Sequence, residues 1–200
     1  MVELILVRHG ETDSNLKGTY LGWTDIELNQ KGLRQASLVA EQLKKLDIDR
    51  IYSSPLKRAC KTAEVINEHF DHKIMYSDCL KERNFGVWDN LTYQEIVEGY
   101  PKEHSEWMED WINYNIKGGE SAFESSSRVA NFTNSIISGK DEGKIIVVTH
   151  LGTIRFMLAH LLGMKLEDSW RFRVDNCSIT RLEIKDGYAV LTHLNCSSIG

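Results

Sequence analysis

Leu4-Ile5-Leu6-Val7-Arg8-His9-Gly10 places a histidine directly after a short, unbroken apolar run. A second apolar run, residues 145–149, leads in the same way into His150. Short apolar runs followed by Gly and then by helical patterning are typical of central parallel strands that are buried on both faces. Because parallel strands point in one direction, we expect both imidazoles at the carboxyl edge of one sheet, where open α/β sheets bind ligands. The sequence therefore predicts that His9 and His150 come together.

The size and charge of the chain narrow the class of protein. It has 200 residues, of which 42% are hydrophobic, and no internal repeat or linker, so we expect one domain over 1–200. A net charge of −5 without long runs of like charge argues against a nucleic-acid surface. No segment reaches the ~18 apolar residues of a membrane span, and no signal peptide is recognisable at the start. We expect a cytoplasmic protein with neither a membrane nor a nucleic acid as partner.

The cysteine and histidine spacing does not indicate a metal site. Four cysteines are scattered without a CxxC pair, at positions 60, 79, 177 and 196. His69 and His72 lie close in sequence, but no third or fourth ligand is evident nearby. We therefore expect reduced thiols, no metal and no cofactor.

Strand and helix patterns alternate along the chain. A helix is expected to open near Asn29, with Leu33, Ala36, Ala40 and Leu43 on one face. The other expected elements are a strand around 48–53, a helix from Ser54-Pro55, a strand around 74–77, two short helices within 92–114, helices over about 121–137 and 152–163, and a hairpin of strands 179–184 and 188–194. This order predicts a three-layer α/β/α sandwich, whose mostly parallel central sheet ends in an antiparallel C-terminal edge.

The helix from Ser54-Pro55 brings an arginine to the same edge of the sheet. Ser54 is expected to be the N-cap and Pro55 the first helical residue. The buried stripe would be Leu56, Ala59, Cys60, Ala63 and Ile66. Arg58 then lies within the first turn, on another face, close to both histidines.

These residue types fit a phosphate site. The guanidinium groups of Arg8 and Arg58 are planar, permanently charged donors suited to a tetrahedral oxyanion, and a helix N-terminus adds backbone donors. A neutral imidazole in such a pocket can attack phosphorus and form a phosphohistidine. The arginines and the second imidazole would stabilise the transferring group without a metal.

The chain resembles the histidine phosphatase superfamily, which has the phosphoglycerate mutase-like fold. The motifs that carry the resemblance are Arg8-His9-Gly10-Glu11-Thr12 with Asn15, Gly22-Trp23-Thr24-Asp25, Ser53-Ser54-Pro55-Leu56-Lys57-Arg58-Ala59, Leu80-Lys81-Glu82, Phe85-Gly86-Val87-Trp88, Gly118-Gly119-Glu120-Ser121, Thr149-His150-Leu151-Gly152 and Asn176. They occur in family order and cover essentially the whole chain.

The resemblance implies a role for each matched position. His9 would be the nucleophile, and Glu82 would protonate the leaving alcohol and then activate water. Repulsion from a bound phosphate dianion favours a protonated carboxyl group, which suits that task. The groups that would hold the phosphoryl oxygens are Arg8, Asn15, Arg58 and His150.

The departures from the family's mutases favour hydrolysis. Mutases of this family carry Thr before the Gly-Trp pair and a later arginine pair that grips the substrate carboxylate. Here Leu21 precedes Gly22, and no arginine lies between Thr92 and Gly119. We therefore expect a phosphatase of small phosphomonoesters and rank a phosphoglycerate mutase lower.

A cap insertion, roughly 84–120, resembles that of the α-ribazole phosphatases of cobalamin assembly. Trp107 and Trp111 ahead of a Gly-Glu turn, together with Leu21 and Gly22, fit that branch and become candidate substrate contacts. The tryptophans would pack against a benzimidazole-like base; alternatively, being four apart, they form one buried helix stripe. The expected substrate is α-ribazole 5′-phosphate. The alternatives are a broad-specificity sugar-phosphate or nucleotide phosphatase and a non-catalytic phosphate-binding protein.

Overall fold

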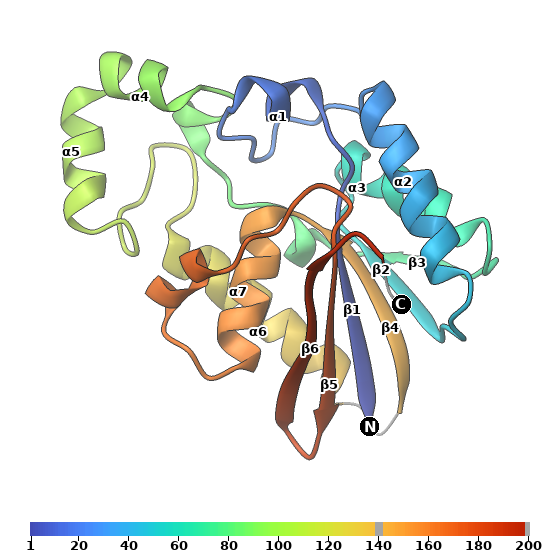
Figure 1. The fold of residues 1–200 in the computed structure, drawn as a ribbon. Helices are drawn as coiled ribbons and strands as arrows, with labels where there is room; N and C mark the ends of the chain where they lie inside the picture. Colours follow the sequence, from blue (N-terminus) through green and yellow to red (C-terminus); the bar gives the residue numbers. More distant parts are fainter. Residues whose placement is uncertain (139–141, 199–200) are drawn as a thin grey trace.

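The computed structural model describes residues 1–138 and 142–198 of the chain. A six-stranded sheet runs through this part in the order β3-β2-β4-β1-β5-β6 (Figure 1). The strands are β1 (Val2–Arg8), β2 (Arg50–Ser53), β3 (Ile74–Tyr76), β4 (Gly143–Thr149), β5 (Ile179–Lys185) and β6 (Tyr188–Cys196). The strands β1 to β4 are parallel, whereas β5 and β6 pair antiparallel at one edge.

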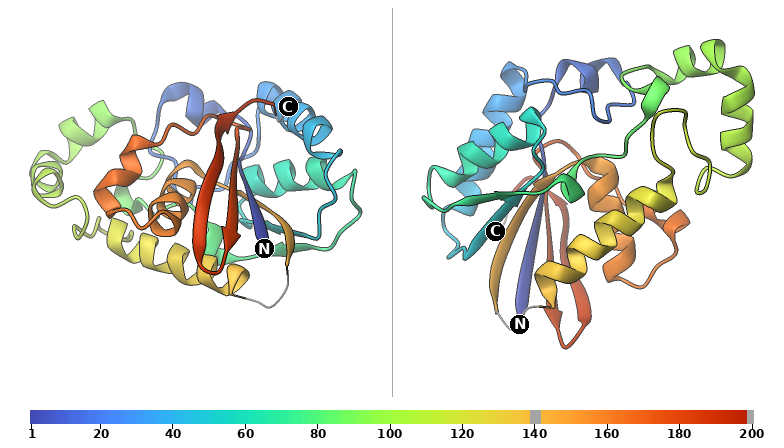
Figure 2. Two further views of the ribbon diagram at one scale, coloured as in Figure 1. Left: turned by 60° about the horizontal axis from the view of Figure 1, so that its bottom comes forward. Right: turned by 180° about the vertical axis from the view of Figure 1, so that it is seen from behind.

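Helices cover both faces of the sheet (Figures 1 and 2). They are α1 (Asp13–Lys17), α2 (Gln30–Leu43), α3 (Lys57–Asn67), α4 (Tyr93–Gly99), α5 (Pro101–Glu109), α6 (Ala122–Ile137) and α7 (Leu151–Leu161), with short 3₁₀ segments η1 (Asp78–Leu80), η2 (Gly86–Trp88) and η3 (Leu166–Arg171). One apolar cluster joins the sheet to α2 and α3, and another joins it to α6 and α7. This arrangement confirms the predicted three-layer sandwich with an antiparallel C-terminal edge.

The two apolar runs form adjacent strands at the centre of the sheet. The residues from Leu4 to Val7 and from Ile145 to Val148 are fully buried, as expected for strands covered on both faces. β1 and β4 pair in parallel with Arg8 opposite Thr149. His9 and His150 therefore leave their strands at the same level.

The predicted hairpin at the C-terminal end is also present. The turn between β5 and β6 contains Asp186 and Gly187, both with positive φ, at 51° and 79°. Two such residues in succession suit the tight turn that joins twisted antiparallel strands. The hairpin places β5 directly beside β1.

Two local expectations were wrong. α3 begins at Lys57 with Leu56 as N-cap, and no side chain caps it. Ser54 lies before the cap, and its hydroxyl accepts hydrogen bonds from Nε2 of His150 at 2.8 Å and from the amide of Leu56 at 3.3 Å. Leu33 does not belong to the buried face of α2, since 38% of its surface is exposed and Val39 fills that face instead.

The segment 84–120 projects beside the sheet and carries α4 and α5 (Figure 1). Trp88, Ile96 and Ile116 form its small buried core. α5 contributes no buried residue. We refer to residues 84–120 as the cap. In the described residues, no helix combines the length and the apolar content that a membrane crossing requires.

Candidate active site

The two histidines lie in contact at the carboxyl edge of the sheet. Their ring centroids are 5.1 Å apart and the ring planes are inclined by 59°. His9 follows β1, and His150 follows β4 and caps α7. Both side chains are buried. The register of β1 and β4 is thus what brings together two residues that are far apart in the sequence.

The His9 ring is held as a neutral imidazole with one nitrogen available. Its Nδ1 lies 2.7 Å from the carbonyl oxygen of Gly10. Because a carbonyl can only accept, Nδ1 carries the proton and Nε2 keeps its lone pair. Burial, followed by the charges of Arg58 and Arg8, holds the pKa of His9 well below its ordinary value. The His9 ring is therefore neutral at neutral pH, with the lone pair of Nε2 available.

His150 is fixed from both sides. Its Nδ1 accepts a hydrogen bond from Nε of Arg58 at 3.3 Å, so its Nε2 carries the proton and donates to Oγ of Ser54. Burial and the charge of Arg58 also hold the pKa of His150 well below its ordinary value. Both rings are therefore neutral, and each carries one proton, on Nδ1 in His9 and on Nε2 in His150.

Arg58 lies behind the histidines and organises the neighbouring loop. Its guanidinium donates to the carbonyl oxygens of Thr24 and Gly22 at 2.9 and 2.6 Å. Asp89 accepts from the backbone amides of the same two residues, both at 2.7 Å. Burial lowers the pKa of Arg58 to about 10. Arg58 therefore places a positive charge next to His150 and also holds the backbone of Gly22 and Thr24 in position.

Arg8 presents an unused donor beside His9. Its Nη1 donates to the carbonyl oxygen of Val174 at 2.7 Å. Its Nε is buried, with no hydrogen-bond partner among the described residues. Burial lowers the pKa of this guanidinium, although Glu82 opposes the shift. A buried unpaired donor of this kind fits a bound anionic oxygen.

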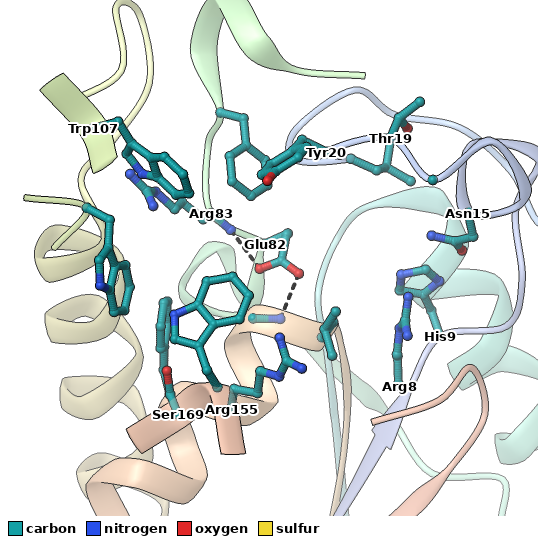
Figure 3. Close-up of a pocket in the computed structure, with 18 residues that line it drawn as sticks. Arg8, His9, Asn15, Thr19, Tyr20, Glu82, Arg83, Trp107, Arg155 and Ser169 are labelled. Carbon is teal, nitrogen blue, oxygen red and sulfur yellow. Dashed lines mark hydrogen bonds between the residues drawn. The ribbon is translucent and has the colours of Figure 1, made fainter. Parts of the chain in front are cut away.

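Asn15 lies on the same side of the site as His9 (Figure 3). Its Oδ1 accepts hydrogen bonds from the amide of Thr12 at 3.1 Å and from Nδ2 of Asn176 at 3.2 Å. Asn176 also donates to the carbonyl oxygen of His9. With Oδ1 committed, the side-chain amide nitrogen of Asn15 is the group left for a ligand.

Glu82 lies across the site from His9 (Figure 3). Oε1 accepts from the amide of Arg83 and Oε2 from the amide of Gly152, both at 2.9 Å. Gly152 is the second residue of α7, so the carboxylate also faces a helix N-terminus. A Cβ on Gly152 would collide with Oε1. The position of Glu82 therefore depends on a glycine in the first turn of α7.

A cavity of about 270 Å³ lies between these groups. Of the predicted site residues, it is lined by Arg8, His9, Asn15, Leu21, Glu82, Trp107 and Trp111. Arg58 and His150 stand behind His9, and Gly22 contributes backbone contacts to Arg58 and Asp89. The functional roles of these residues stay predictions. Within residues 1–138 and 142–198, no His, Cys, Asp or Glu cluster is arranged to hold a metal ion.

The two cap tryptophans do not form one helix stripe. α5 ends at Glu109, so Trp111 lies beyond the helix that carries Trp107. Trp107 packs edge-on against Trp88, and Trp111 packs edge-on against Trp170, with centroids 6.0 and 5.7 Å apart. Each of these tryptophans thus packs against another tryptophan and also lines the cavity.

Several residues of the cavity wall were not predicted. They are Gly18, Thr19, Tyr20, Arg83, Phe85, Leu151, Gly152, Arg155, Phe156, Ser169 and Trp170. Leu151, Gly152 and Arg155 are spaced as one face of a helix that follows His150, so helical periodicity contained a signal for Arg155. Trp170 follows a loop whose course no sequence pattern reveals.

Comparison with known proteins places this geometry in a family. The family model for the histidine phosphatase superfamily (branch 1) matches residues 4–197. Phosphoserine phosphatase 1 of Hydrogenobacter thermophilus is 35% identical over 98% of this chain and 92% of its own length. The adenosylcobalamin/alpha-ribazole phosphatase of Salmonella typhimurium is 30% identical over 99% and 98%. A crystal structure of a putative alpha-ribazole-5′-P phosphatase from Escherichia coli superposes with a TM-score of 0.95 at 30% identity, covering 100% of this chain and 98% of that one.

Proposed function

Because this chain belongs to the histidine phosphatase superfamily, we propose that it hydrolyses small phosphomonoesters without a metal, through a phosphohistidine. The observation that carries this proposal is the neutral His9 ring, whose unprotonated Nε2 shares a cavity with the Glu82 carboxyl group. A nucleophile on one wall and an acid on the other suit displacement at a phosphorus held between them.

In the first step, Nε2 of His9 attacks phosphorus and the bond from phosphorus to the ester oxygen breaks. Protonated Glu82 gives its proton to that oxygen, so the product leaves as a neutral alcohol. Donors of Arg8 and Asn15 stabilise the negative charge on the three remaining phosphoryl oxygens, and Arg58 adds its positive charge from behind His9. The buried Nε of Arg8 would gain a partner in this step.

In the second step, the Glu82 carboxylate takes a proton from water, and the resulting hydroxide-like oxygen attacks phosphorus. The bond between phosphorus and Nε2 of His9 breaks, and inorganic phosphate leaves. Glu82 is again protonated and His9 again neutral, so one cycle consumes one water. The hydrogen bond from Nδ1 to Gly10 keeps the ring oriented through both steps.

α-Ribazole 5′-phosphate, an intermediate of cobalamin nucleotide-loop assembly, is the first candidate substrate. Trp107, Trp111 and Trp170 give the cavity an aromatic wall that suits a planar base. The alpha-ribazole phosphatases among the relatives support this candidate.

A phosphomonoester that also carries a carboxylate is the second candidate. Arg83 and Arg155, which sequence patterns did not place in the site, line the same cavity. A phosphoserine phosphatase at 35% identity supports this candidate. A broad sugar-phosphate phosphatase and a mutase rank below both.

Rapid quenching tests the proposed reaction. With a ³²P-labelled phosphomonoester, we expect an acid-labile phosphoenzyme in the wild type and none in His9→Ala. His193→Ala, in a half-exposed histidine of β6, is the matched control and should label normally. A phosphoenzyme that persists in His9→Ala would contradict the assignment of the nucleophile, and phosphate transfer without release of inorganic phosphate would indicate a mutase.

A further inference from the structure

Arg155 lacks the acidic partner that several other arginines of the described chain have. Arg128, Arg171, Arg173 and Arg181 each form an ion pair, with Glu120, Asp168, Asp175 and Glu3. In residues 1–138 and 142–198, no ion pair involves Arg155. Its side chain instead rises from α7 toward the space between Glu82 and Arg8 (Figure 3).

The guanidinium of Arg155 is held in one orientation with its outer nitrogens open. Nε donates to the carbonyl oxygen of Phe172 at 2.8 Å. Cζ lies 5.1 Å from the centroid of the Trp170 ring, so the cation stacks on an aromatic face. Neither Nη1 nor Nη2 has a protein hydrogen-bond partner in the described residues. The two outer nitrogens therefore form a preorganised fork that faces the cavity.

The surroundings of Arg155 favour an anion. Partial burial lowers its pKa, and Glu82 is the charge that opposes this shift. The charge of Arg155 also lowers the pKa of Arg8, which places the two guanidinium groups near each other. Arg83 adds a third guanidinium to the cavity wall, while Glu82 is the one acidic side chain among the described residues that line it. Partly desolvated cations without a counter-charge are stabilised when a bound anion supplies one.

Arg83 adds positive charge to the cavity wall, but two of its nitrogens already donate to backbone carbonyl oxygens. Its Nε donates to the carbonyl oxygen of Glu120 at 2.9 Å, and its Nη2 faces the carbonyl oxygen of Tyr114 at 3.4 Å. Its Cζ also lies over the Phe85 ring, 5.7 Å from the centroid. Of these two arginines, Arg155 is therefore the one with both outer nitrogens free for a second group of the substrate, next to the proposed phosphate position at Arg8 and His9.

We propose that Arg155, stacked on Trp170, binds a carboxylate of the substrate while the phosphate lies against His9. The inference rests on the proposed phosphatase activity and names its substrate class: small phosphomonoesters of hydroxy or amino acids. A carboxylate is planar and matches the two outer nitrogens of the guanidinium in a bidentate geometry. α-Ribazole 5′-phosphate has no such group, so this subsite favours the second candidate substrate over the first.

A pair of matched substrates isolates the carboxylate. O-Phosphoserine and O-phosphoethanolamine share the phosphate, the linking carbons and the amine, and differ only in the carboxylate. We expect the wild type to have a kcat/KM about 10- to 100-fold higher for phosphoserine, the range for a charged hydrogen-bonded pair. Arg155→Gln should lower this ratio to near 1. Arg155→Lys should restore part of it, because it keeps the charge but loses the fork.

Two controls separate a carboxylate contact from a general loss of surface charge or of folded structure. Arg171→Gln changes an exposed arginine that pairs with Asp168 and should leave the ratio at its wild-type value. Thermal unfolding of Arg155→Gln checks that the fold is kept. A wild-type ratio near or below 1 overturns the inference and needs no variant.

The remaining outcomes are equally distinct. If Arg155→Gln lowers kcat/KM equally for both substrates, Arg155 acts on the phosphate or on the fold, and the carboxylate subsite is refuted. If the wild type hydrolyses neither substrate but does hydrolyse p-nitrophenyl phosphate or α-ribazole 5′-phosphate, the subsite fails while the phosphatase proposal stands. If no phosphomonoester is hydrolysed, the proposed function itself fails.

Discussion

The two ends of the cavity are built in different ways. We call the end at Arg8 and His9 the phosphate end, because the proposed phosphate lies there, and the end at Trp107 and Trp111 the cap end. At the phosphate end, His9 and His150 continue buried strands, and each ring is held by hydrogen bonds to fixed partners. At the cap end, α5 has no buried residue, and the wall is made of aromatic side chains that pack mainly on one another. The first end is positioned by strands and hydrogen bonds, and the second by side-chain packing.

This difference suggests a division of labour, in which one end of the cavity performs the chemical step and the other end selects the substrate. Groups that perform chemistry need fixed geometry, which rigid elements supply. Groups that choose among substrates tolerate replacement, because aromatic packing adapts to different shapes. We therefore expect substitutions at the phosphate end to change the chemical step and substitutions at the cap end to change substrate affinity.

The largest expected effect is that of Glu82→Gln at the phosphate end. Glutamine keeps the size but cannot transfer a proton, so kcat should fall by about 10²- to 10⁴-fold for esters with poor leaving groups. Steady-state kinetics with an alkyl phosphate and with p-nitrophenyl phosphate measure the difference. The loss should be smaller for the nitrophenyl ester, whose leaving group needs little protonation in the first step. An unchanged rate with the alkyl ester would contradict the assigned role.

Gly152→Ala tests how the acid is positioned. The added Cβ collides with Oε1 of Glu82 and displaces the carboxylate from its two backbone donors. We expect kcat to fall by about 10²-fold, the effect of a misplacement near 1 Å. Gly99→Ala, which meets open space in the cap, is the control and should retain wild-type kcat. Equal kcat values for both variants would show that Glu82 does not depend on Gly152.

The phosphate end should also make stability depend on pH. Burial keeps His9 and His150 neutral in the folded chain, with pKa values well below the ordinary 6.5, whereas the unfolded chain protonates them near that pH. The unfolded state then binds more protons, so the free energy of unfolding falls as pH drops below about 6.5. For two histidines, we expect a loss of about 2 kcal/mol between pH 6.5 and 5.5.

Urea denaturation at pH 7.5, 6.5 and 5.5 measures this loss. His150→Asn removes one of the two groups and should roughly halve it. A free energy of unfolding that is constant over this range, or that rises as pH falls, would show that the histidines are not held neutral.

The smallest expected effect belongs to the cap. Trp107→Leu removes an aromatic face from the cavity wall but keeps an apolar side chain, so KM for α-ribazole 5′-phosphate should rise by about 10-fold if a base stacks there. kcat should change by less than KM. Met108→Leu, at an exposed neighbouring position, is the control. A fall in kcat with unchanged KM would assign the cap a part in the chemical step and break the division of labour.

Much of the fold and the phosphate end could be predicted from the sequence. The runs before His9 and His150 are short, apolar and followed by glycine, a pattern that few structures other than buried parallel strands satisfy. Their parallel direction then fixes the common edge without any knowledge of side-chain contacts. The same argument placed Arg58 near the site, although its helix starts at Lys57 and not at Ser54-Pro55.

The cavity wall could not be predicted in the same way. Arg83, Arg155 and Trp170 come from a loop, a helix and a 3₁₀ segment, and their meeting depends on how loops pack. Helical periodicity places Arg155 on the face of α7 that carries Leu151 and Gly152, but it describes one element at a time and contains no information about which loops that face meets. Ser54 shows the same limit: its sequence context fits an N-cap, but its hydroxyl contacts His150, 96 residues away, and the amide of Leu56, which precedes the helix.

The pairing of Arg8 with Thr149 across β1 and β4 has a consequence for engineering and evolution. The distance between the His9 and His150 rings follows from the spacing of neighbouring strands, which backbone hydrogen bonding sets to nearly the same value in every sheet. This distance therefore does not depend on which side chains occupy residues 84–120. A chimera that receives this segment from a relative should change the contacts that Trp107 and Trp111 offer to a substrate, while the proposed phosphoenzyme at His9 and the proposed carboxylate contact of Arg155 should stay those of the recipient.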